Sequence, residues 1–214
     1  MSVYDQQRLR KGAAELGVEL AEMQEQGLLK YLALLHKWNK VYALISRREG
    51  DDWVARHLLD SLAVLPYING SRVIDVGSGA GLPGIPLALM CPERQFTLLD
   101  SNNKKTRFMT QAVIELGLKN VEVKHCRVEQ LAAEAPFDTV ISRAFATISD
   151  MLAVAGQLAG TDGKYLAMKG VFPEEELAAL PPGYHAEVVH ALQVPFEEGD
   201  RHLAVVVADA AAVQ

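Results

Sequence analysis

The sequence predicts an α/β fold: a mostly parallel, seven-stranded sheet with an antiparallel C-terminal hairpin and an N-terminal helical extension. From residue 71 onward, short apolar runs alternate with helical segments, which is typical of parallel strands connected by helices. The last two apolar runs, 184–194 and 202–208, lack a helix-length connection and are therefore expected to pair antiparallel. Residues 1–69 show helical periodicity and no strand pattern.

Residues 1–69 are predicted to form a helical cap that packs on a larger domain at 70–214. An apolar stripe recurs there at steps of three and four residues: Leu28, Tyr31, Leu32, Leu35, Trp38, Tyr42 and Ile45. A second helix is expected after Asp51 or Asp52, either of which can cap it. Its apolar positions are Val54, Leu58, Leu62 and Leu65, and Pro66 ends it.

The larger domain is expected to begin with five parallel strands. Their predicted ranges are 73–76, 95–100, 121–123, 137–142 and 164–169. Helices are expected after the first strand and at 103–116, 148–158 and 174–180, with a short helix or turn at 127–135. Ligands of such sheets bind beyond the C-terminal ends of the strands, so the residues at those ends are the candidates for function.

Composition narrows the class of protein. The chain of 214 residues carries 21 basic and 27 acidic side chains, a net charge of −6, which argues against a protein that coats nucleic acid non-specifically. No apolar run approaches the ~20 residues that span a bilayer, and the N-terminus lacks the apolar core of a signal peptide. With only two cysteines, a monomeric cytoplasmic protein without disulfides or membrane contact is expected.

A glycine-rich stretch, Val73–Gly84, joins the first strand to the next helix and predicts a nucleotide-cofactor turn. Gly77 and Gly79 fit the first two places of a dinucleotide fingerprint, but Leu82 stands at the third. Asp75, ahead of the glycines, suits a cationic ligand better than a pyrophosphate. S-adenosylmethionine carries an ammonium and a sulfonium and no phosphate, so it is the expected cofactor. The alternative is a tight turn that needs small residues for packing alone.

Four further residues stand at the ends of strands. Asp100 can accept hydrogen bonds from ribose hydroxyls or, alternatively, cap the next helix. Val128 and Glu129 follow the third strand, where a flat base would lie, although Glu129 could simply be a solvated residue. Arg143 follows the fourth strand and could contact a phosphate, a guanine edge or the cofactor's carboxylate, or form a surface ion pair.

Some motifs of other chemistries are missing from the sequence. No Asn/Asp-Pro-Pro-aromatic motif follows the fourth strand, where many amino-group methyltransferases have it, and no Pro-Cys dipeptide occurs. No P-loop lysine follows the glycines. The six histidines show no metal-ligand spacing with acidic residues, so no metal site is predicted.

Several motifs together resemble those of the bacterial ribosomal RNA small-subunit methyltransferase G family, also called GidB. The resemblance covers nearly the whole chain and rests on 75–86 (DVGSGAGLPGIP), 96–101 (FTLLDS), 127–129 (RVE), 141–146 (ISRAFA), 168–170 (MKG), 38–42 (WNKVY), 57–61 (HLLDS) and 201–203 (RHL). The chain departs from the family at Ala43, where members usually have an asparagine.

The resemblance implies a class I, Rossmann-like, S-adenosylmethionine-dependent methyltransferase. Its expected target is N7 of the guanine at position 527 of 16S rRNA, in the small ribosomal subunit or an assembly intermediate. Carried over by position, the cofactor contacts are Gly77, Leu82, Val128, Glu129 and Arg143. The remaining expected contacts come from the general class I pattern and the strand-end argument: Asp75, Gly79 and Asp100.

The expected substrate determines which further residues matter. Guanine N7 has a lone pair and no proton, so no general base is required, and Arg143 and Arg201 are hypothesised to position the guanine or its phosphates. Candidate RNA contacts are Arg8, Arg10, Lys11, Arg47, Arg48, Lys104, Lys105 and Arg107, each of which could equally be a solvated helix-face residue. Three alternatives stay open: a methyltransferase with another substrate, an NAD-dependent oxidoreductase, and a non-catalytic RNA-binding or assembly factor.

Overall fold

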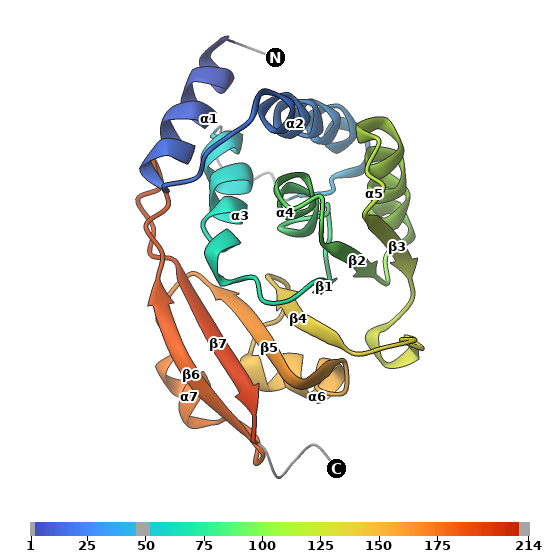
Figure 1. Ribbon diagram of the computed structural model, residues 1–214, viewed down its shortest axis with the longest axis vertical. Coiled ribbons are helices and arrows are strands. Elements are labelled where there is room, and N and C mark those ends of the chain that lie inside the picture. The colour runs from blue at the N-terminus through green and yellow to red at the C-terminus, as the bar shows by residue number, and fades with distance from the viewer. Residues whose placement is uncertain (1–2, 46–51, 210–214) are drawn as a thin grey trace.

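A computed structural model describes residues 3–45 and 52–209 of the chain and has an α/β architecture (Figure 1). The sheet contains seven strands in the order β3-β2-β1-β4-β5-β7-β6. Their bounds are β1 Arg72–Val76, β2 Gln95–Asp100, β3 Val121–His125, β4 Phe137–Ser142, β5 Ala159–Lys169, β6 Tyr184–Ala191 and β7 His202–Ala208. Strands β1 to β5 pair parallel, and β7 pairs antiparallel with β5 and β6, which confirms the predicted fold class.

Helices cover both faces of this sheet. Their bounds are α1 Val3–Glu15, α2 Glu22–Tyr42, α3 Asp60–Leu62, α4 Gly84–Met90, α5 Asn103–Leu116, α6 Ile148–Ala155 and α7 Glu174–Ala178. Helices α1 to α5 lie on one side of the sheet, and α6 and α7 lie on the other (Figure 1). The strand order reverses between β1 and β4, and this switch point is where such sheets bind ligands.

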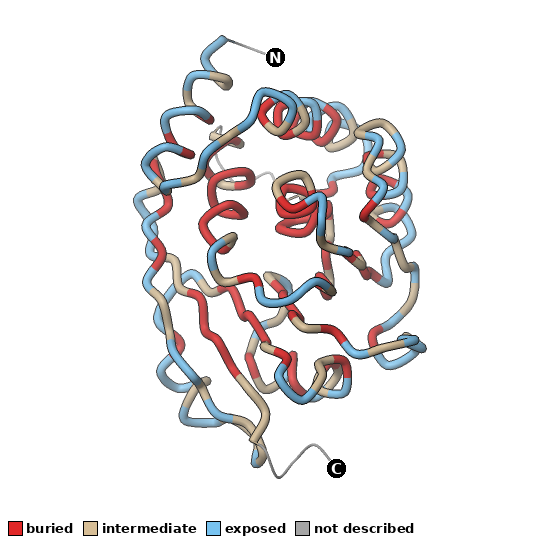
Figure 2. Tube along the Cα trace, in the orientation of Figure 1, coloured by how far each residue is buried: buried red, intermediate tan, exposed pale blue. Residues whose placement is uncertain are grey.

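Two hydrophobic clusters hold the layers together, one on each face of the sheet. The larger cluster combines Leu9, Leu28 and Leu58 of the N-terminal helices with Phe108 of α5 and with strand residues. Buried positions therefore run along the inner sides of the helices and through the central strands (Figure 2). Because the larger cluster joins residues from both sides of position 70, the cap packs as part of the main core; its division into a separate domain stays a prediction.

Several element boundaries differ from the sequence expectation. Strand β5 begins at Ala159, because backbone pairing with β4 overrides the loop-like composition of 159–163. Strand β3 extends to His125, and β6 ends at Ala191. The expected helices are also shorter: α6 ends at Ala155, α7 ends at Ala178, and 127–135 contains only a 3₁₀ turn, Val128–Gln130.

The helix predicted after Asp51 or Asp52, which follows α2 in the chain, is irregular. A π-helical turn, Val54–Leu59, precedes the short helix α3, and the Asp60 N–H donates to the carbonyl of Ala55. Of the two predicted capping residues, Asp52 accepts a hydrogen bond from the Ala55 N–H at 3.0 Å, whereas Asp51 lies outside the described residues. Such π turns insert one extra residue, which rotates the following side chains around the helix axis.

Helix α2 ends before the last position of its predicted apolar stripe. Ala43 follows Tyr42 with φ 46 and ψ 55, a left-handed conformation, and its N–H donates to the Asn39 carbonyl at 3.2 Å. Ile45 therefore lies beyond the helix, although its side chain still packs against the larger core cluster. Asparagine tolerates this conformation better than alanine does, which gives a physical reason for the residue that the family usually has there.

Candidate functional site

Two cavities open at the C-terminal edge of the parallel strands. The first, the glycine-loop pocket, has a volume of about 370 Å³ and is lined by Gly77, Asp100, Val128 and Glu129, among others. The second, the arginine pocket, has a volume of about 350 Å³ and is lined by Asp60, Arg143, Arg201 and His202, among others. The structure thus distributes six of the predicted site residues over two neighbouring pockets, whereas Asp75, Gly79 and Leu82 line neither of them.

The glycine loop takes a conformation that only small residues permit. Gly77 has φ +70, and a Cβ atom built on it would lie 2.7 Å from the Cβ of Ala144. Its N–H donates to the Leu99 carbonyl at 2.8 Å, which ties the loop to the end of β2. A side chain at position 77 would therefore meet both backbone strain and a steric clash at the entrance of the pocket.

Asp100 is fixed at the floor of the glycine-loop pocket. Its Oδ2 accepts a hydrogen bond from Gly79 N–H at 2.9 Å, and its Oδ1 accepts one from Asn102 N–H at 2.8 Å. The residue that caps α5 is Asn102, whose side chain accepts from the Lys104 N–H. Each carboxylate oxygen of Asp100 keeps a second lone pair, so the group can still accept bonds from a pair of ribose hydroxyls.

Val128 and Glu129 form the 3₁₀ turn that closes the opposite side of this pocket. Val128 is 9% exposed, whereas Glu129 is exposed. An apolar surface beside backbone amides suits a flat base, and the pocket volume falls within the range of about 300–1,000 Å³ that is common for ligand sites. The residues present therefore fit a nucleoside cofactor.

Asp75 and Leu82, also predicted as cofactor contacts, lie behind the loop rather than on a pocket wall. Asp75 is completely buried, and its Oδ2 accepts from the Gly84 N–H at 2.9 Å. Burial raises the pKa of its carboxyl group to about 6, and Oδ1 has no hydrogen-bond partner among the described residues. Leu82 is only 3% exposed. A cofactor role for either residue stays a prediction.

Tyr31, in helix α2, contacts the backbone of the glycine loop. Its side chain, completely buried on α2, donates a hydrogen bond from Oη to the Ala80 carbonyl at 2.7 Å. The sequence places Tyr31 in an apolar stripe, and periodicity alone carries no sign of this polar contact. The extension therefore supports the cofactor loop directly, which the sequence did not reveal.

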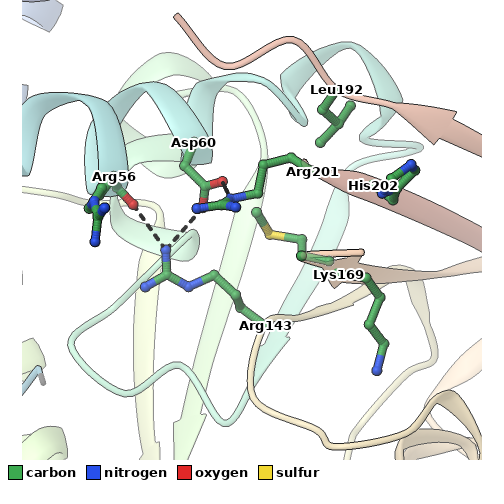
Figure 3. Close-up of a pocket in the computed structure, with 9 residues that line it drawn as sticks. Arg56, Asp60, Arg143, Lys169, Leu192, Arg201 and His202 are labelled. Carbon is green, nitrogen blue, oxygen red and sulfur yellow. Dashed lines mark hydrogen bonds and ion pairs between the residues drawn. The ribbon is translucent and has the colours of Figure 1, made fainter. Parts of the chain in front are cut away.

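The arginine pocket brings together residues from four separate parts of the chain: 56–60, 143, 168–170 and 192–202 (Figure 3). The Asp60 carboxylate accepts from Arg143 Nη1 at 3.0 Å and from Arg201 Nε at 3.2 Å. Arg143 Nη1 also donates to the Arg56 carbonyl at 3.3 Å. A second carboxylate, Glu197, accepts from Arg201 Nη2 at 2.8 Å and from Arg56 Nε at 3.1 Å.

Arg143 and Arg201 therefore lie together, and their role in positioning a substrate stays a prediction. Neither lines the glycine-loop pocket, so a cofactor contact of Arg143 stays a prediction. Asp60 lies in the 57–61 motif on which the family resemblance partly rests. In the sequence, however, a lone aspartate in a helix gives no indication that its carboxylate contacts two arginines.

The candidate RNA contacts fall into different environments. Arg8 is tied to Asp52 through its Nε at 2.6 Å and lies over the Phe196 ring at 4.0 Å, and Arg10 pairs with Glu25 at 2.7 Å. Lys11, Lys104 and Arg107 are exposed, and Lys105 lines the glycine-loop pocket. Arg47 and Arg48 lie outside the described residues.

The described residues, 3–45 and 52–209, contain neither a metal-binding cluster nor a membrane-spanning helix. Within them, no group of three or more histidine, cysteine, aspartate or glutamate side chains is arranged to hold a metal ion. Within the same ranges, no helix combines the length and apolar character required to cross a membrane.

The fold and the glycine-loop pocket define a protein of the class I methyltransferase type. The fold resembles magnesium protoporphyrin IX methyltransferase (ChlM) from Synechocystis PCC 6803, with a TM-score of 0.59 and 18% identity, over 83% of this chain and 97% of that one. It also resembles the tRNA methyltransferase TrmK of B. subtilis, with a TM-score of 0.56 and 15% identity, over 70% and 65% of the two chains. The chain belongs to the GidB family, rRNA small subunit methyltransferase G, whose model matches residues 24–204.

Relatives with this family name match nearly the full chain. Ribosomal RNA small subunit methyltransferase G of Pseudomonas syringae pv. syringae is 52% identical over 199 residues, 93% of each chain. The proteins of the same name from Marinobacter nauticus and Pseudomonas aeruginosa PAO1 are 50% and 53% identical, over 93% and 92% of each chain respectively.

Proposed function

We propose that this protein transfers a methyl group from S-adenosylmethionine to N7 of a guanine in 16S rRNA, within the small ribosomal subunit or an assembly intermediate. The observation that carries the proposal is family membership over residues 24–204, together with relatives named for ribosomal RNA methylation at about 50% identity. The two neighbouring pockets support it, because one suits a nucleoside cofactor and the other an anionic, acceptor-rich substrate.

The cofactor is proposed to occupy the glycine-loop pocket. Asp100 would accept bonds from the ribose, and Val128 and Glu129 would line the base. The carboxylates of Asp75 and Asp100 make this edge of the sheet favourable for a cationic ligand, because opposite charges attract strongly where burial lowers the effective dielectric. Bound there, S-adenosylmethionine supplies an electrophilic methyl group on its sulfonium.

The substrate is proposed to reach this edge through the arginine pocket. Guanidinium groups donate in a planar fork that matches phosphate oxygens and base carbonyl groups, so Arg143 and Arg201 can orient a nucleotide. The acceptor nitrogen carries a lone pair and no proton, so the protein's main task is alignment, which is worth up to ~7–11 kcal/mol in the best cases. The absence of a Pro-Cys nucleophile and of an Asn-Pro-Pro-Tyr motif from the sequence is compatible with this chemistry.

The proposal also covers the oligomeric state and the cellular location of the protein. We propose a monomer that works in the cytoplasm, where ribosomal subunits are assembled. Because the chain is acidic overall, with a net charge of −6, we propose that it recognises a folded ribosomal particle through a local basic surface rather than coating free RNA.

Methyl transfer from radiolabelled S-adenosylmethionine tests the proposed function. Purified protein is incubated with small ribosomal subunits, free 16S rRNA, large subunits, a protein pool and a metabolite pool. Label is expected in the 16S rRNA of the small subunits, and not in free 16S rRNA, large subunits, proteins or metabolites. Label in proteins or metabolites would favour a different methyltransferase, and cofactor binding without transfer to any ribosomal particle would favour a non-catalytic assembly factor. Titration with NAD and S-adenosylhomocysteine separates the oxidoreductase alternative.

A further inference from the structure

Asp60 occupies an unusual electrostatic position beneath the arginine pocket. Its side chain is only 4% exposed, and its two oxygens accept from two different arginines, Arg143 and Arg201. A carboxylate buried to this extent needs charged partners, because removal from water penalises its ionised form. Here the partners come from two elements that are far apart in sequence, one after β4 and one before β7.

The two arginines retain donors for a ligand. The side chains of Arg143 and Arg201 are 29% and 28% exposed, and both line the arginine pocket. Arg201 uses Nε toward Asp60, Nη1 toward the Asp200 carbonyl and Nη2 toward Glu197, whereas Arg143 uses Nη1 toward Asp60 and the Arg56 carbonyl. Each guanidinium has five N–H donors, so these contacts fix its orientation and leave other N–H groups available to the cavity.

Local backbone structure places Asp60 at this point. The π-helical turn Val54–Leu59 ends there, with the Asp60 N–H donating to Ala55, and α3 begins at Asp60. A π turn rotates the following residues relative to a regular helix, and such turns are frequent at functional sites. The helical extension thus places the Asp60 carboxylate beside Arg143 and Arg201 (Figure 3).

We propose that Asp60 is a positioning residue for methyl transfer, acting through Arg143 and Arg201 on an RNA substrate bound in the arginine pocket. This inference rests on the proposed function. Asp60 sets the direction of both guanidinium forks, so that their outward donors meet the phosphate or base carbonyl oxygens of the nucleotide. A purely structural tie between the extension and the sheet would predict a loss of stability without a specific effect on turnover.

The variant Asp60→Asn keeps the size of the side chain and removes its charge. Glu25→Gln is the matched control, because Glu25 is also buried in the extension, is 6% exposed at its side chain and pairs with Arg10, away from both pockets. For both variants we would measure kcat and KM with the ribosomal substrate, the Kd for S-adenosylhomocysteine, and Tm. Asp60→Asn is expected to lower kcat about tenfold or more.

For the same variant, the Kd for S-adenosylhomocysteine is expected to stay within about twofold of the wild type, because Asp60 does not line the glycine-loop pocket. A kcat equal to that of Glu25→Gln would overturn the inference. If Asp60→Asn fails to fold, Asp60→Glu keeps the charge but moves it by one methylene, and the same tenfold loss of kcat is expected. Wild-type kcat in Asp60→Glu would then count against the inference.

A second measurement needs no RNA. Arg201 Nε lies 3.2 Å from the Asp60 carboxylate, so the NMR signal of its N–H proton is expected to exchange slowly with water in the wild type and rapidly in Asp60→Ala, whose side chain has no acceptor. Unchanged exchange in the variant would contradict the positioning role. If the wild type labels no RNA, the proposed function fails, and this signal still decides whether Asp60 orients the arginine.

Discussion

The hydroxyl group of Tyr31 donates a hydrogen bond to the Ala80 carbonyl at 2.7 Å, and so links a helix of the N-terminal extension to the glycine loop. The ring is completely buried and lies 6.3 Å from that of Phe108, so the donor has a fixed direction. This contact fixes the loop from the side opposite to the glycine-loop pocket. The extension therefore shapes the cofactor site as well as covering the core.

Tyr31→Phe should weaken cofactor binding. The substitution keeps the packed ring and leaves the Ala80 carbonyl without its buried donor, a loss of about 1 kcal/mol and hence about fivefold in affinity. Calorimetric titration with S-adenosylhomocysteine measures the change. Tyr165→Phe is the matched control, because Tyr165 is equally buried and donates to the Gly156 carbonyl on the other face of the sheet. Equal affinities for the two variants would contradict the role given to Tyr31.

Arg143→Ala should abolish most methyl transfer. It removes one of the three guanidinium groups that line the arginine pocket and leaves Asp60 with Arg201 as its arginine partner. We expect kcat/KM to fall by roughly a hundredfold in the labelled-methyl assay, which corresponds to about 2.7 kcal/mol. Arg94→Ala is the control, since Arg94 is similarly exposed at 27% but donates to the Ile68 carbonyl, away from both pockets. Wild-type transfer by Arg143→Ala would show that this arginine does not contact substrate.

Phe172→Ala should raise the KM for the ribosomal substrate. The Phe172 ring is 53% exposed just after β5 and meets the ring of His202, a residue of the arginine pocket, at 5.6 Å. An exposed aromatic ring in contact with a residue of the arginine pocket suits an unpaired base, and stacking of a base on such a ring is worth about 1–3 kcal/mol. A rise of at least about fivefold in KM is therefore expected.

Phe172→Trp should keep the wild-type KM because it keeps an aromatic surface. Ile114→Ala removes a comparably exposed apolar side chain, 68% exposed, from α5 and serves as the control. The stacking role would be refuted by a Phe172→Ala variant whose KM matches that of Ile114→Ala.

Ala43→Gly should stabilise the protein by about 1 kcal/mol, because glycine accepts the left-handed conformation at φ 46 without steric cost. Ala43→Asn should have the same sign and a smaller size. Urea unfolding measures both. Ala33→Gly is the control, because Ala33 is solvent-exposed in the middle of α2. This substitution should lower the free energy of unfolding by about 1 kcal/mol, a change of opposite sign. Destabilisation by Ala43→Gly would mean that the alanine methyl group contributes more than its strain costs.

His57 should make folding stability depend on pH. Burial, reinforced by the positive charge of Arg143, lowers the pKa of its imidazole to about 3, below the unfolded value of 6.5. Between these values the unfolded state binds more protons, so stability rises with pH in this window and is lost as pH falls from 6.5 toward 3. The loss at pH 5 is about 2 kcal/mol.

The stability difference between wild type and His57→Gln isolates this effect. Asp75 contributes with the opposite sign, because burial raises its pKa to about 6 and its cost grows as pH rises from 3.8 to 6. This contribution is common to both proteins and cancels in the difference. A difference that stays constant from pH 7 to pH 5 would contradict a neutral, buried His57.

The sheet could be predicted from the sequence because each strand contains at least a short apolar or alternating stretch, although the start of β5 at 159–163 does not. The residues of the glycine-loop pocket followed for the same reason, since Gly77, Asp100 and Val128 stand at the C-terminal ends of consecutive strands. Local pattern and tertiary position agree for these residues.

The arginine pocket and the contact between the extension and the glycine loop could be anticipated only in part. Arg143 follows a strand, but Asp60 and Tyr31 lie in helices whose periodicity reports burial and not polar contacts. Their roles arise from the packing of the extension on the sheet and from one π-helical turn, both of which are tertiary features. For Asp75 the sequence predicted a cofactor contact, because the residue lies near the C-terminal end of a strand. In the structure its side chain is completely buried behind the glycine loop and does not line the pocket.

Mapping of 16S rRNA modification in cells tests the central claim most directly. RNA from a strain that lacks this gene would be compared by mass spectrometry with RNA from the same strain complemented by the wild type or by Arg143→Ala. We predict that one 7-methylguanosine of 16S rRNA disappears on deletion, returns with the wild type and stays absent with the variant. An unchanged set of 7-methylguanosines in the deletion strain would contradict the account.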